Sequence, residues 1–346
     1  MKGFAFQRRK LVHLIVAAVA VGACAGFTAS ASAATVTALN GAGSTLVAPL
    51  EAEWASGFAN KSGITVNYQA VGSGTGITDI SQGLVDFGAS DAPLSPTQAA
   101  GCHNCIQVPW ALSATGVGYN IGGVGKKLHL TGPVLAKIYL GQITNWDAPQ
   151  IESLNKRVHL PNLKITPIFR SDGSGDTYAF TNYLTKVSST WASKVNFATA
   201  VSFPTGVGGK GNSGVTADLE SINGSIAYIA VSYLIAHNLP AVAIANAAGN
   251  YEYPNLANIE NAAQTVKSVP SSDALHIVDP PKSAKIAYPI STFTYVIAPT
   301  TAPNGGILKQ FVKYALGPGQ SFGAGLDFAP LPKAVLKADK ATANRF

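Results

Sequence analysis

The chain has 346 residues, of which 47% are hydrophobic and only 12% are charged, so its composition excludes a disordered chain and allows one or two substantial cores. Its 35 Gly and 20 Pro residues follow no three-residue period, which excludes a collagen-like chain, and three Cys are too few for a disulfide-rich scaffold. The formal net charge of +7 predicts a mild attraction to anions, and part of it belongs to the N-terminal segment.

The N-terminus has the three-part layout of an export signal. Four basic residues between Lys2 and Lys10 precede an apolar run at 11–23, and Ala31-Ser32-Ala33 fits the A-x-A cleavage pattern. The run of 13 residues is too short to span a bilayer stably, so we interpret residues 1–33 as a signal peptide and expect an exported protein. Their removal leaves 20 basic against 17 acidic residues, too small an excess for a nucleic-acid-binding surface.

The three cysteines receive separate interpretations. Cys24 directly ends the apolar run in a lipobox-like segment, so it is either lipidated or removed with the signal peptide, and both readings stay open. Cys102 and Cys105 form a C-x-x-C motif, which in an exported chain is redox-active, a zinc half-site or a structural disulfide. Because the motif lies in a polar loop and no second Cys/His pair has ligand spacing, we predict a structural disulfide.

Beyond this segment, short apolar strands alternate with helical patterns, which predicts an α/β layered fold. Strands are expected at residues 36–39, 66–71, 85–89, 165–169 and 226–231. Helices are expected where apolar residues recur at helical spacing, namely Val47, Leu50, Trp54 and Phe58; Ile77, Ile80 and Leu84; and Phe180, Tyr183, Leu184 and Val187. The Gly/Pro-rich stretch 203–214 is expected to be a loop, and extended crossings near 110–116 and 286–291 are candidate hinges.

A Gly/Ser turn lies between a strand and a helix at three places, residues 41–45, 72–76 and 170–177. A helix N-terminus carries unpaired N–H groups and about half a positive charge, so such a turn can bind an anion without a Lys. Each turn taken alone is explained more simply as a helix cap. Because the carboxyl ends of parallel strands share one edge of a sheet, three such turns can converge on one crevice.

Charged side chains beside these turns indicate which anion would fit. The guanidinium of Arg170 suits bidentate contact with an oxyanion, and Asp172 could pair with it and hold it in place. Ionised Asp91 accepts hydrogen bonds and donates none, so in an anion site it suits phosphate, which brings a proton, and not sulfate. The alternative for Asp91, a cap on the turn at Pro93, is equally open.

Several segments resemble the phosphate-binding proteins of bacterial phosphate ABC transporters (PstS type), namely residues 39–45, 85–93, 138–147, 170–175 and the loop 206–211. The similarity runs from about Leu39 to the region of Pro332. It implies a two-lobed Venus-flytrap fold of the periplasmic-binding-protein superfamily, type II, with two hinge strands between the lobes. Lobe I would then comprise residues 34–113 and 287–346, and lobe II residues 114–286.

The same resemblance implies high-affinity binding of inorganic phosphate outside the cell membrane and its delivery to an ABC permease, by a monomer without enzymatic activity, metal or cofactor. The implied site comprises Ser44, Thr45, Leu46, Ser73, Asp91, Arg170, Asp172, Ser174, Gly175 and Asp176. Leu46 stands where Phe is frequent, and it would bind through its N–H. Asp176 stands where Thr often donates to phosphate, so it would either accept a second phosphate proton or turn away.

Two other functions were weighed against phosphate binding. An exported phosphatase would need a nucleophile with a base or a two-metal site, yet the six His show no H-x-H or H-E-x-x-H spacing. A receptor for another tetrahedral oxyanion, sulfate or molybdate, would share the fold, and the role of Asp91 distinguishes it.

Overall fold

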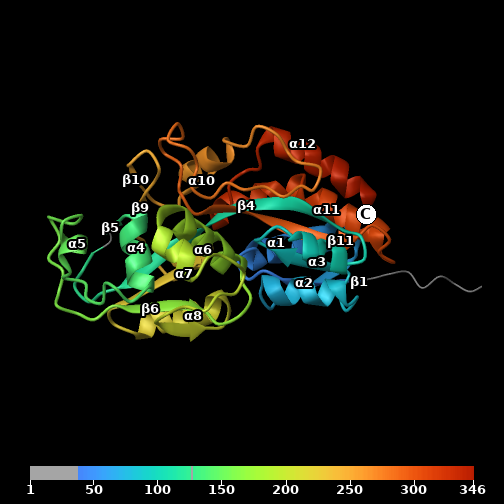
Figure 1. Ribbon diagram of the computed structural model, residues 1–346. Helices are drawn as coiled ribbons and strands as arrows, with labels where there is room; N and C mark the ends of the chain where they lie inside the picture. Colours follow the sequence, from blue (N-terminus) through green and yellow to red (C-terminus); the bar gives the residue numbers. More distant parts are fainter. Residues whose placement is uncertain (1–37, 126–127) are drawn as a thin grey trace, which may run out of the picture. The chain divides into compact units, whose positions relative to one another are not determined.

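The computed structural model describes residues 38–125 and 128–346, so the predictions for the signal peptide and for Cys24 lie outside the described residues. The larger sheet has eight strands in the order β2-β1-β3-β11-β4-β8-β6-β7. These strands are β1 (Ala38–Gly43), β2 (Thr65–Ala70), β3 (Phe87–Ser90), β4 (Cys105–Asn120), β6 (Thr166–Arg170), β7 (Val207–Gly209), β8 (Ser225–Ala230) and β11 (Ser291–Pro299). Figure 1 shows the long strand β4 of this sheet beside β11. A second sheet, in the order β10-β9-β5, contains β5 (His129–Leu130), β9 (Ala243–Ala245) and β10 (Tyr251–Glu252).

The long strand β4 divides the larger sheet into two parts. Its residues 105–114 pair with β11, and its residues 115–120 pair with β8, both antiparallel. We call β2, β1, β3, β11 and residues 105–114 the first half-sheet, and residues 115–120 with β8, β6 and β7 the second half-sheet. The change of partner falls inside the segment 110–116 expected as a hinge, while the lobe boundaries at residues 113 and 286 stay a prediction.

Helices follow most of the parallel strands. They are α1 (Ala48–Ser62), α2 (Ser73–Ser81), α3 (Pro96–Gly101), α4 (Gly132–Tyr139), α5 (Pro149–Glu152), α6 (Gly175–Val187), α7 (Ser189–Lys194), α8 (Gly211–Ser221), α9 (Val231–Ala236), α10 (Leu256–Ala263), α11 (Gly305–Ala315) and α12 (Lys333–Thr342). Two 3₁₀ segments complete the description, η1 (Pro318–Leu326) and η2 (Ala343–Arg345). Among the residues that the structure describes, no helix is both long and apolar enough to cross a membrane.

The predicted apolar stripes become buried helix faces, except that Val187 is half-buried and Leu84 is exposed. Leu50, Trp54 and Phe58 of α1 are buried, and α1 ends at Gly63, whose φ of 74° is the left-handed conformation of a helix stop. The prediction that Leu84 continues the stripe of α2 is wrong, because α2 ends at Ser81 and Leu84 is 67% exposed. Gly83, with a φ of 70°, turns the chain away before Leu84.

Two segments expected to be turns or loops contain strand. The prediction of a strand at 36–39 is too short, because β1 continues to Gly43; a side chain at Gly41 would lie 2.1 Å from the ring of Phe87. The stretch 203–214 is not only a loop, since it contains β7 and the first turn of α8. At Gly209 the backbone of Val215 comes within 2.7 Å of where a Cβ would stand, so glycine lets strand and helix pack closely here.

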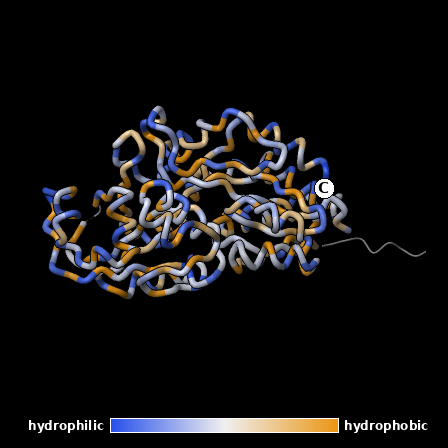
Figure 2. Tube along the Cα trace, in the orientation of Figure 1, coloured by the Kyte–Doolittle hydropathy of each residue, from blue (hydrophilic) through white to orange (hydrophobic). Residues whose placement is uncertain are grey.

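Aromatic side chains fill the interior beneath both half-sheets. Trp54 packs against Trp110 with ring centroids 5.0 Å apart, and Phe180 stacks on Tyr228 at 4.5 Å. Figure 2 shows hydrophobic residues concentrated along the inner strands and hydrophilic residues on the outlying loops. The apolar core thereby fixes the strand ends from which the functional side chains project.

Candidate functional site

The structure brings the predicted site residues together where the two half-sheets meet. They lie at the carboxyl ends of β1, β3 and β6 and at the first residues of α2 and α6. The expectation of a single shared edge is wrong, because β6 runs opposite to β1 and β3, and the carboxyl ends of the two half-sheets instead face each other at the junction. We call this group, with two residues added below, the polar cluster: Ser44, Thr45, Leu46, Ser73, Asp91, Arg170, Asp172, Ser174, Gly175, Asp176, Thr115 and Asn212. Each of its side chains except Asp172 is less than one tenth exposed.

Asp91 is the carboxylate at the end of β3. The hydroxyl of Ser44 donates to its two oxygens at 2.6 and 2.7 Å, and Ser73 Oγ lies 3.4 Å from Oδ2. Burial, followed by the charge of Asp176, raises the pKa of Asp91 to about 8, although hydrogen bonds and Arg170 oppose the shift. The cap on the following turn is supplied by Ser90, whose Oγ accepts from the N–H of Ala92 at 3.1 Å, so Asp91 itself faces the cluster.

The turn after β1 is organised by Ser44. Its Oγ accepts from the N–H groups of Leu46 at 3.0 Å and Val47 at 3.3 Å, immediately before α1. In this structure the N–H of Leu46, expected to bind the anion, therefore donates to Ser44. Val47 N–H and Leu46 N–H nonetheless belong to the positive end of α1, which is directed at Asp91 through Ser44.

Arg170 is the guanidinium of the cluster, at the end of β6. Its Nε donates to Asp172 Oδ1 at 2.8 Å, a second nitrogen donates to Asp172 Oδ2, and the third donates to Asp176 Oδ2 at 3.2 Å. Burial alone would raise the pKa of Asp172, but the hydrogen bond and charge of Arg170 outweigh it, and the pKa of Asp172 lies below its usual value. The pairing that the sequence suggested for Asp172 is present, and the guanidinium is held in place on two sides.

Residues at the start of α6 form the part of the polar cluster that faces Asp91 from the second half-sheet. Ser174 Oγ accepts from the N–H of Asp176 at 3.1 Å, so it is a helix cap and a cluster residue at once. The N–H of Gly175 donates to Ser73 Oγ at 3.0 Å, which joins the two half-sheets directly. A Cβ on Gly175 would lie 2.3 Å from Cβ of Asp91, so only glycine permits this approach.

Asp176 turns into the cluster and does not point away. Thr115 donates to its Oδ1 at 2.7 Å, and Arg170 and Asn212 donate to its Oδ2 at 3.2 and 2.8 Å. Burial raises the pKa of Asp176, while Arg170, Thr115 and Asn212 favour its charged form. Of the two roles considered for this carboxylate, the geometry leaves it as an acceptor inside the cluster.

Two residues of the cluster were missed by sequence reasoning, Asn212 and Thr115. Asn212 stands in the first turn of α8, directly after the Gly-rich loop that was expected to carry no regular structure. The signal available in the sequence was an Asn directly after a Gly-rich segment, where a helix could start. Thr115 lies within β4 at the change of strand partner, and its spacing along a continuous buried strand gave no warning of a polar contact.

The cluster as a whole suits an oxyanion that carries protons. It contains one guanidinium and three carboxylates, so its attraction for an anion rests on N–H and O–H donors and on the N-termini of α2, α6 and α8. A fully deprotonated anion would face Asp91 and Asp176 without a hydrogen to offer them. An anion with its own O–H groups removes that conflict.

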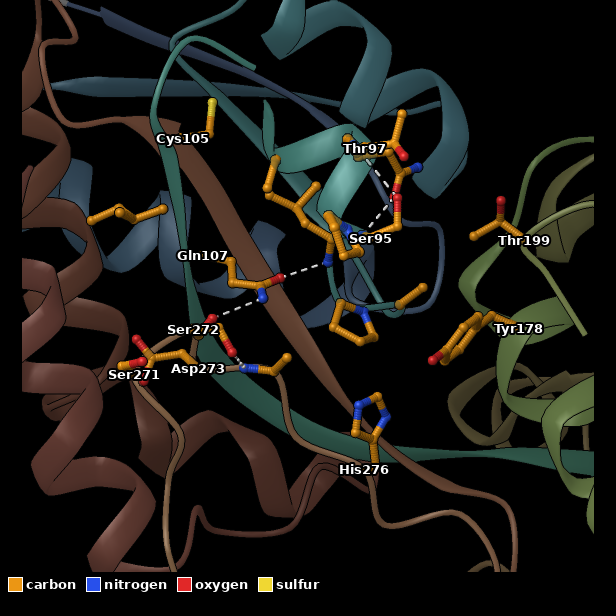
Figure 3. Close-up of a pocket in the computed structure, with 18 of the residues that line it drawn as sticks. Ser95, Thr97, Cys105, Gln107, Tyr178, Thr199, Ser271, Ser272, Asp273 and His276 are labelled. Carbon is orange, nitrogen blue, oxygen red and sulfur yellow. Dashed lines mark hydrogen bonds between the residues drawn. The ribbon is translucent and has the colours of Figure 1, made fainter. Parts of the chain in front are cut away.

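A groove of about 930 Å³ borders the cluster. Figure 3 shows Ser95 and Thr97 on one side of it and Tyr178 and Thr199 on the other. None of the residues that line it belongs to the polar cluster, although Ser174 N–H donates to the carbonyl of Thr199 at 2.8 Å. The polar cluster is therefore packed against the groove and not open into it.

The predicted disulfide is confirmed, because Cys102 and Cys105 are bonded. Cys102 follows α3, and Cys105 is the first residue of β4. The bridge thus closes the tight turn that leads into the strand shared by both half-sheets.

This combination of two joined half-sheets with an anion-directed cluster at their junction defines a solute-binding protein. A family model described as the PBP superfamily domain matches residues 28–318. Two solved structures share the fold, a high-affinity periplasmic phosphate-binding protein (PfluDING) bound with phosphate and a phosphate-binding protein from Stenotrophomonas maltophilia. Their TM-scores are 0.71 and 0.69 at 23% and 20% identity, and each alignment covers 88% of this chain and 93% of the other. The predicted α/β fold of the two-lobed periplasmic-binding-protein superfamily is confirmed.

Sequence relatives narrow the class. The phosphate-binding protein PstS of Xylella fastidiosa (strain Temecula1 / ATCC 700964) is 35% identical over 303 residues, which cover 86% of this chain and 83% of the relative. The phosphate-binding protein PstS3 of Mycobacterium bovis (strain BCG / Pasteur 1173P2) is 35% identical over 291 residues, which cover 78% and 76%. The chain belongs to the family of PstS phosphate-binding proteins.

Proposed function

We propose that this protein binds inorganic phosphate outside the cell membrane and delivers it to the permease of an ABC transporter. The observation that carries the proposal is the buried meeting of Asp91 and Arg170 with the N-termini of α2 and α6 in one cluster. The family supports it, since relatives that cover most of the chain are named phosphate-binding proteins. The protein acts as a receptor and not as an enzyme.

Each cluster residue receives a role from its donor or acceptor character. Thr45, Ser73 and Ser174 donate hydroxyl hydrogens to the anion. The N–H groups of Leu46 and Gly175, which donate to Ser44 and Ser73 in the structure, would donate to the anion in their place when it binds. Asp91 and Asp176 accept hydrogens from the ligand. Arg170, held by Asp172, supplies the fixed positive charge. Ser44 holds Asp91 in place through its hydroxyl.

The binding event is a closure of two lobes about β4 and the segment near residues 286–291. Lobe I comprises residues 34–113 and 287–346, and lobe II residues 114–286. Support comes from the change of strand partner between Ala114 and Thr115 and from cluster residues contributed by both half-sheets. Ligand contacts from both sides would favour the closed state. The receptor works as a monomer and is exported by its N-terminal signal. Cys24 is either removed together with residues 1–33, or it is lipidated as the first residue of the mature chain and holds the receptor at the membrane.

Calorimetry on the chain lacking residues 1–33 tests the proposal. Phosphate is expected to bind with a stoichiometry of one, and sulfate and molybdate at least about 100-fold more weakly, because neither brings a hydrogen to Asp91. Equal affinity for sulfate would contradict the phosphate assignment. Turnover of a chromogenic phosphate ester, measured in parallel, would instead indicate a phosphatase.

One serine of the chain lies in a sequence pattern typical of a hydrolase nucleophile and bears on the phosphatase assay. Residues 319–323 read Gly-Gln-Ser-Phe-Gly, which fits the G-x-S-x-G pattern of a nucleophile elbow. The segment lies in η1, not between a strand and a helix, and Ser321 Oγ donates to the carbonyl of Pro318 at 2.8 Å. Ser321→Ala is therefore expected to leave any residual ester hydrolysis unchanged.

A further inference from the structure

Asn212 makes more contacts inside the polar cluster than its position after a Gly-rich loop suggests. It is fully buried, and its side chain bonds to Thr45, Asp176 and the backbone of Ala230. We propose that Asn212 is a positioning residue of the phosphate site, which turns the hydroxyl hydrogen of Thr45 toward the anion and holds Asp176 as an acceptor. This inference rests on the proposed phosphate-binding function.

The orientation of the Asn212 amide is fixed by its surroundings. The backbone N–H of Ala230 lies 2.9 Å from Oδ1, and because an N–H can only donate, the oxygen must face it. The nitrogen of the amide is then the atom 2.8 Å from Thr45 Oγ1 and 2.8 Å from Asp176 Oδ2. Its two hydrogens serve two acceptors, and no hydrogen-bonding capacity is left over on the nitrogen.

The contacts of Thr45 determine whether its hydroxyl group acts as a donor or as an acceptor toward the anion. Its Oγ1 accepts from the side chain of Asn212 at 2.8 Å and from the backbone N–H of Asn212 at 3.3 Å. A hydroxyl has two lone pairs and one hydrogen, so with both lone pairs engaged its hydrogen must be donated elsewhere. Asn212 thereby converts a hydroxyl that could accept or donate into a dedicated donor for an anion.

The second hydrogen of the amide acts on Asp176. Oδ2 of this carboxylate accepts from Arg170 and Asn212, while Oδ1 accepts, within residues 38–125 and 128–346, from Thr115 alone. One lone pair of Oδ1 remains, which is one place for a ligand hydrogen. A neutral amide supplies this hydrogen bond without adding a positive charge that would change the charge balance of the site.

The contacts of Asn212 also cross between the two half-sheets. Thr45 follows β1 of the first half-sheet, whereas Asn212 and Asp176 start helices packed on the second. The bond from Asn212 to Asp176 stays within the second side, whereas the bond to Thr45 forms only when the two sides meet, so the donor character of Thr45 is set at closure. The orientation of one hydroxyl hydrogen then becomes a consequence of the closed state.

Asn212→Asp tests this inference, because aspartate has nearly the same shape and only accepts. At pH 8 it would take the hydrogen of Thr45 away from the anion and repel Asp176, so phosphate affinity should fall by at least about 100-fold relative to wild type. At pH 5 the new carboxyl is protonated in this crowded site and can donate again, so the loss should shrink at least about tenfold. The ratio of variant to wild-type Kd cancels the titration of phosphate itself. The other ionisable groups of the site, namely Asp91, Arg170, Asp172, Asp176 and Tyr228, are controlled for by Asn212→Ala, which adds no charge beside them.

Two further variants separate positioning from folding. Asn212→Ala should lose about tenfold in affinity with the pH profile of the wild type, because no new charge is introduced. Asn155→Asp is the matched control, since Asn155 is also buried and its amide also makes two donated bonds, to His129 and Ile151, and one accepted bond. It should lower the melting temperature and leave the phosphate Kd and its pH profile unchanged.

The outcomes divide cleanly. A ratio of Kd for Asn212→Asp that is near one at pH 8, or that is large but constant from pH 5 to 8, overturns the role of Asn212 while wild-type phosphate binding preserves the proposed function. Absence of phosphate binding by the wild-type chain overturns the proposed function itself. Should Asn212→Asp fail to fold, a double-mutant cycle of Thr45→Val and Asn212→Ala decides. If the two residues are coupled, the double variant should lose phosphate affinity by a factor at least about fivefold smaller than the product of the two single losses. Additive losses of affinity would contradict the inference.

Discussion

Gly175→Ala tests whether the close contact between the two half-sheets is what binds the anion. Gly175 is the first residue of α6, and alanine is a good helix former, so the helix itself should persist in the variant. The added methyl group would meet Asp91 across the junction, with Cβ 2.3 Å from Asp91 Cβ and 2.6 Å from its Oδ2. The variant thus perturbs closure and leaves each side of the junction able to fold.

The size of the effect follows from that overlap. Two carbon atoms in ordinary contact are 3.4 Å apart or more, so the sides must separate by roughly 1 Å. The bond from Gly175 N–H to Ser73 Oγ, now 3.0 Å, would lengthen to about 4 Å, which is no longer a hydrogen bond. The same separation would draw two proposed donors, the Gly175 N–H and the Ser73 hydroxyl, out of reach of one anion. Loss of two hydrogen bonds to a charged ligand, at about 1.5–3 kcal/mol each, predicts phosphate binding weaker by about 10²- to 10⁴-fold.

Calorimetric titration with phosphate, together with thermal unfolding of the ligand-free chain, measures both consequences. The control is Gly306→Ala in α11, where a Cβ has nothing within 4 Å and where affinity and melting temperature should stay at the wild-type values or above them. Phosphate affinity of Gly175→Ala within threefold of wild type would refute the reasoning, because the anion would then be bound without the contact between Gly175 and Asp91.

Asp91→Asn should narrow the preference for phosphate over sulfate, because the amide can donate to sulfate where a carboxylate cannot, and unchanged selectivity in competition titrations would refute the role of Asp91. Glu51 in α1 is buried with Oε1 unpaired, and burial raises its pKa to about 8, so the folded chain keeps a proton that the unfolded chain loses and the free energy of unfolding falls as pH rises toward 8. In denaturant titrations the free energy of unfolding of Glu51→Gln, relative to that of wild type, should rise by about 1.4 kcal/mol per pH unit between about pH 5 and 8. Free energies of unfolding that change with pH in the same way for both proteins would contradict this. Replacing Cys102 and Cys105 by Ser should reduce stability by about 2 kcal/mol, as expected for a short closed loop, with phosphate affinity unchanged; a loss of affinity would place the bridge in the binding mechanism.

The turns of the site could be predicted from sequence because their signals are local. Glycine and serine after an apolar strand and before a helical stripe specify a strand, a turn and a helix start within about a dozen residues. The rule that parallel strands share one edge brings Thr45 and Ser73 near each other, since β1 and β2 are parallel neighbours. It does not explain Ser174, which follows β6 of the second half-sheet, where the strand runs in the opposite direction. The pairing of Arg170 with Asp172 is local as well, at a separation of two residues.

The remaining features depend on contacts far apart in the chain. Asn212 meets Thr45 across 167 residues, and Thr115 meets Asp176 across 61, so no window of sequence contains either pair. The short strand β7 forms only because β6 offers it an edge, and its own residues, one valine and two glycines, have little strand preference. The apolar spacing wrongly predicted Leu84 within the helix, because spacing alone does not show that the chain turns away at Gly83.

The expected selectivity of this site for phosphate over sulfate depends more on the number of hydrogens that each anion carries than on the size of the anion. Phosphate and sulfate are both tetrahedral, so a shape-matched cavity separates them poorly, whereas Asp91 and Asp176 respond to the hydrogens that each anion brings. One guanidinium among three carboxylates gives no surplus of positive charge, so a ligand without a hydrogen would meet net repulsion. The raised pKa of Asp91, about 8, shows how strongly the buried site resists a further negative charge there. A hydrogen that the ligand donates to Asp91 satisfies the carboxylate without a further charge, and among the two anions only phosphate carries one near neutral pH.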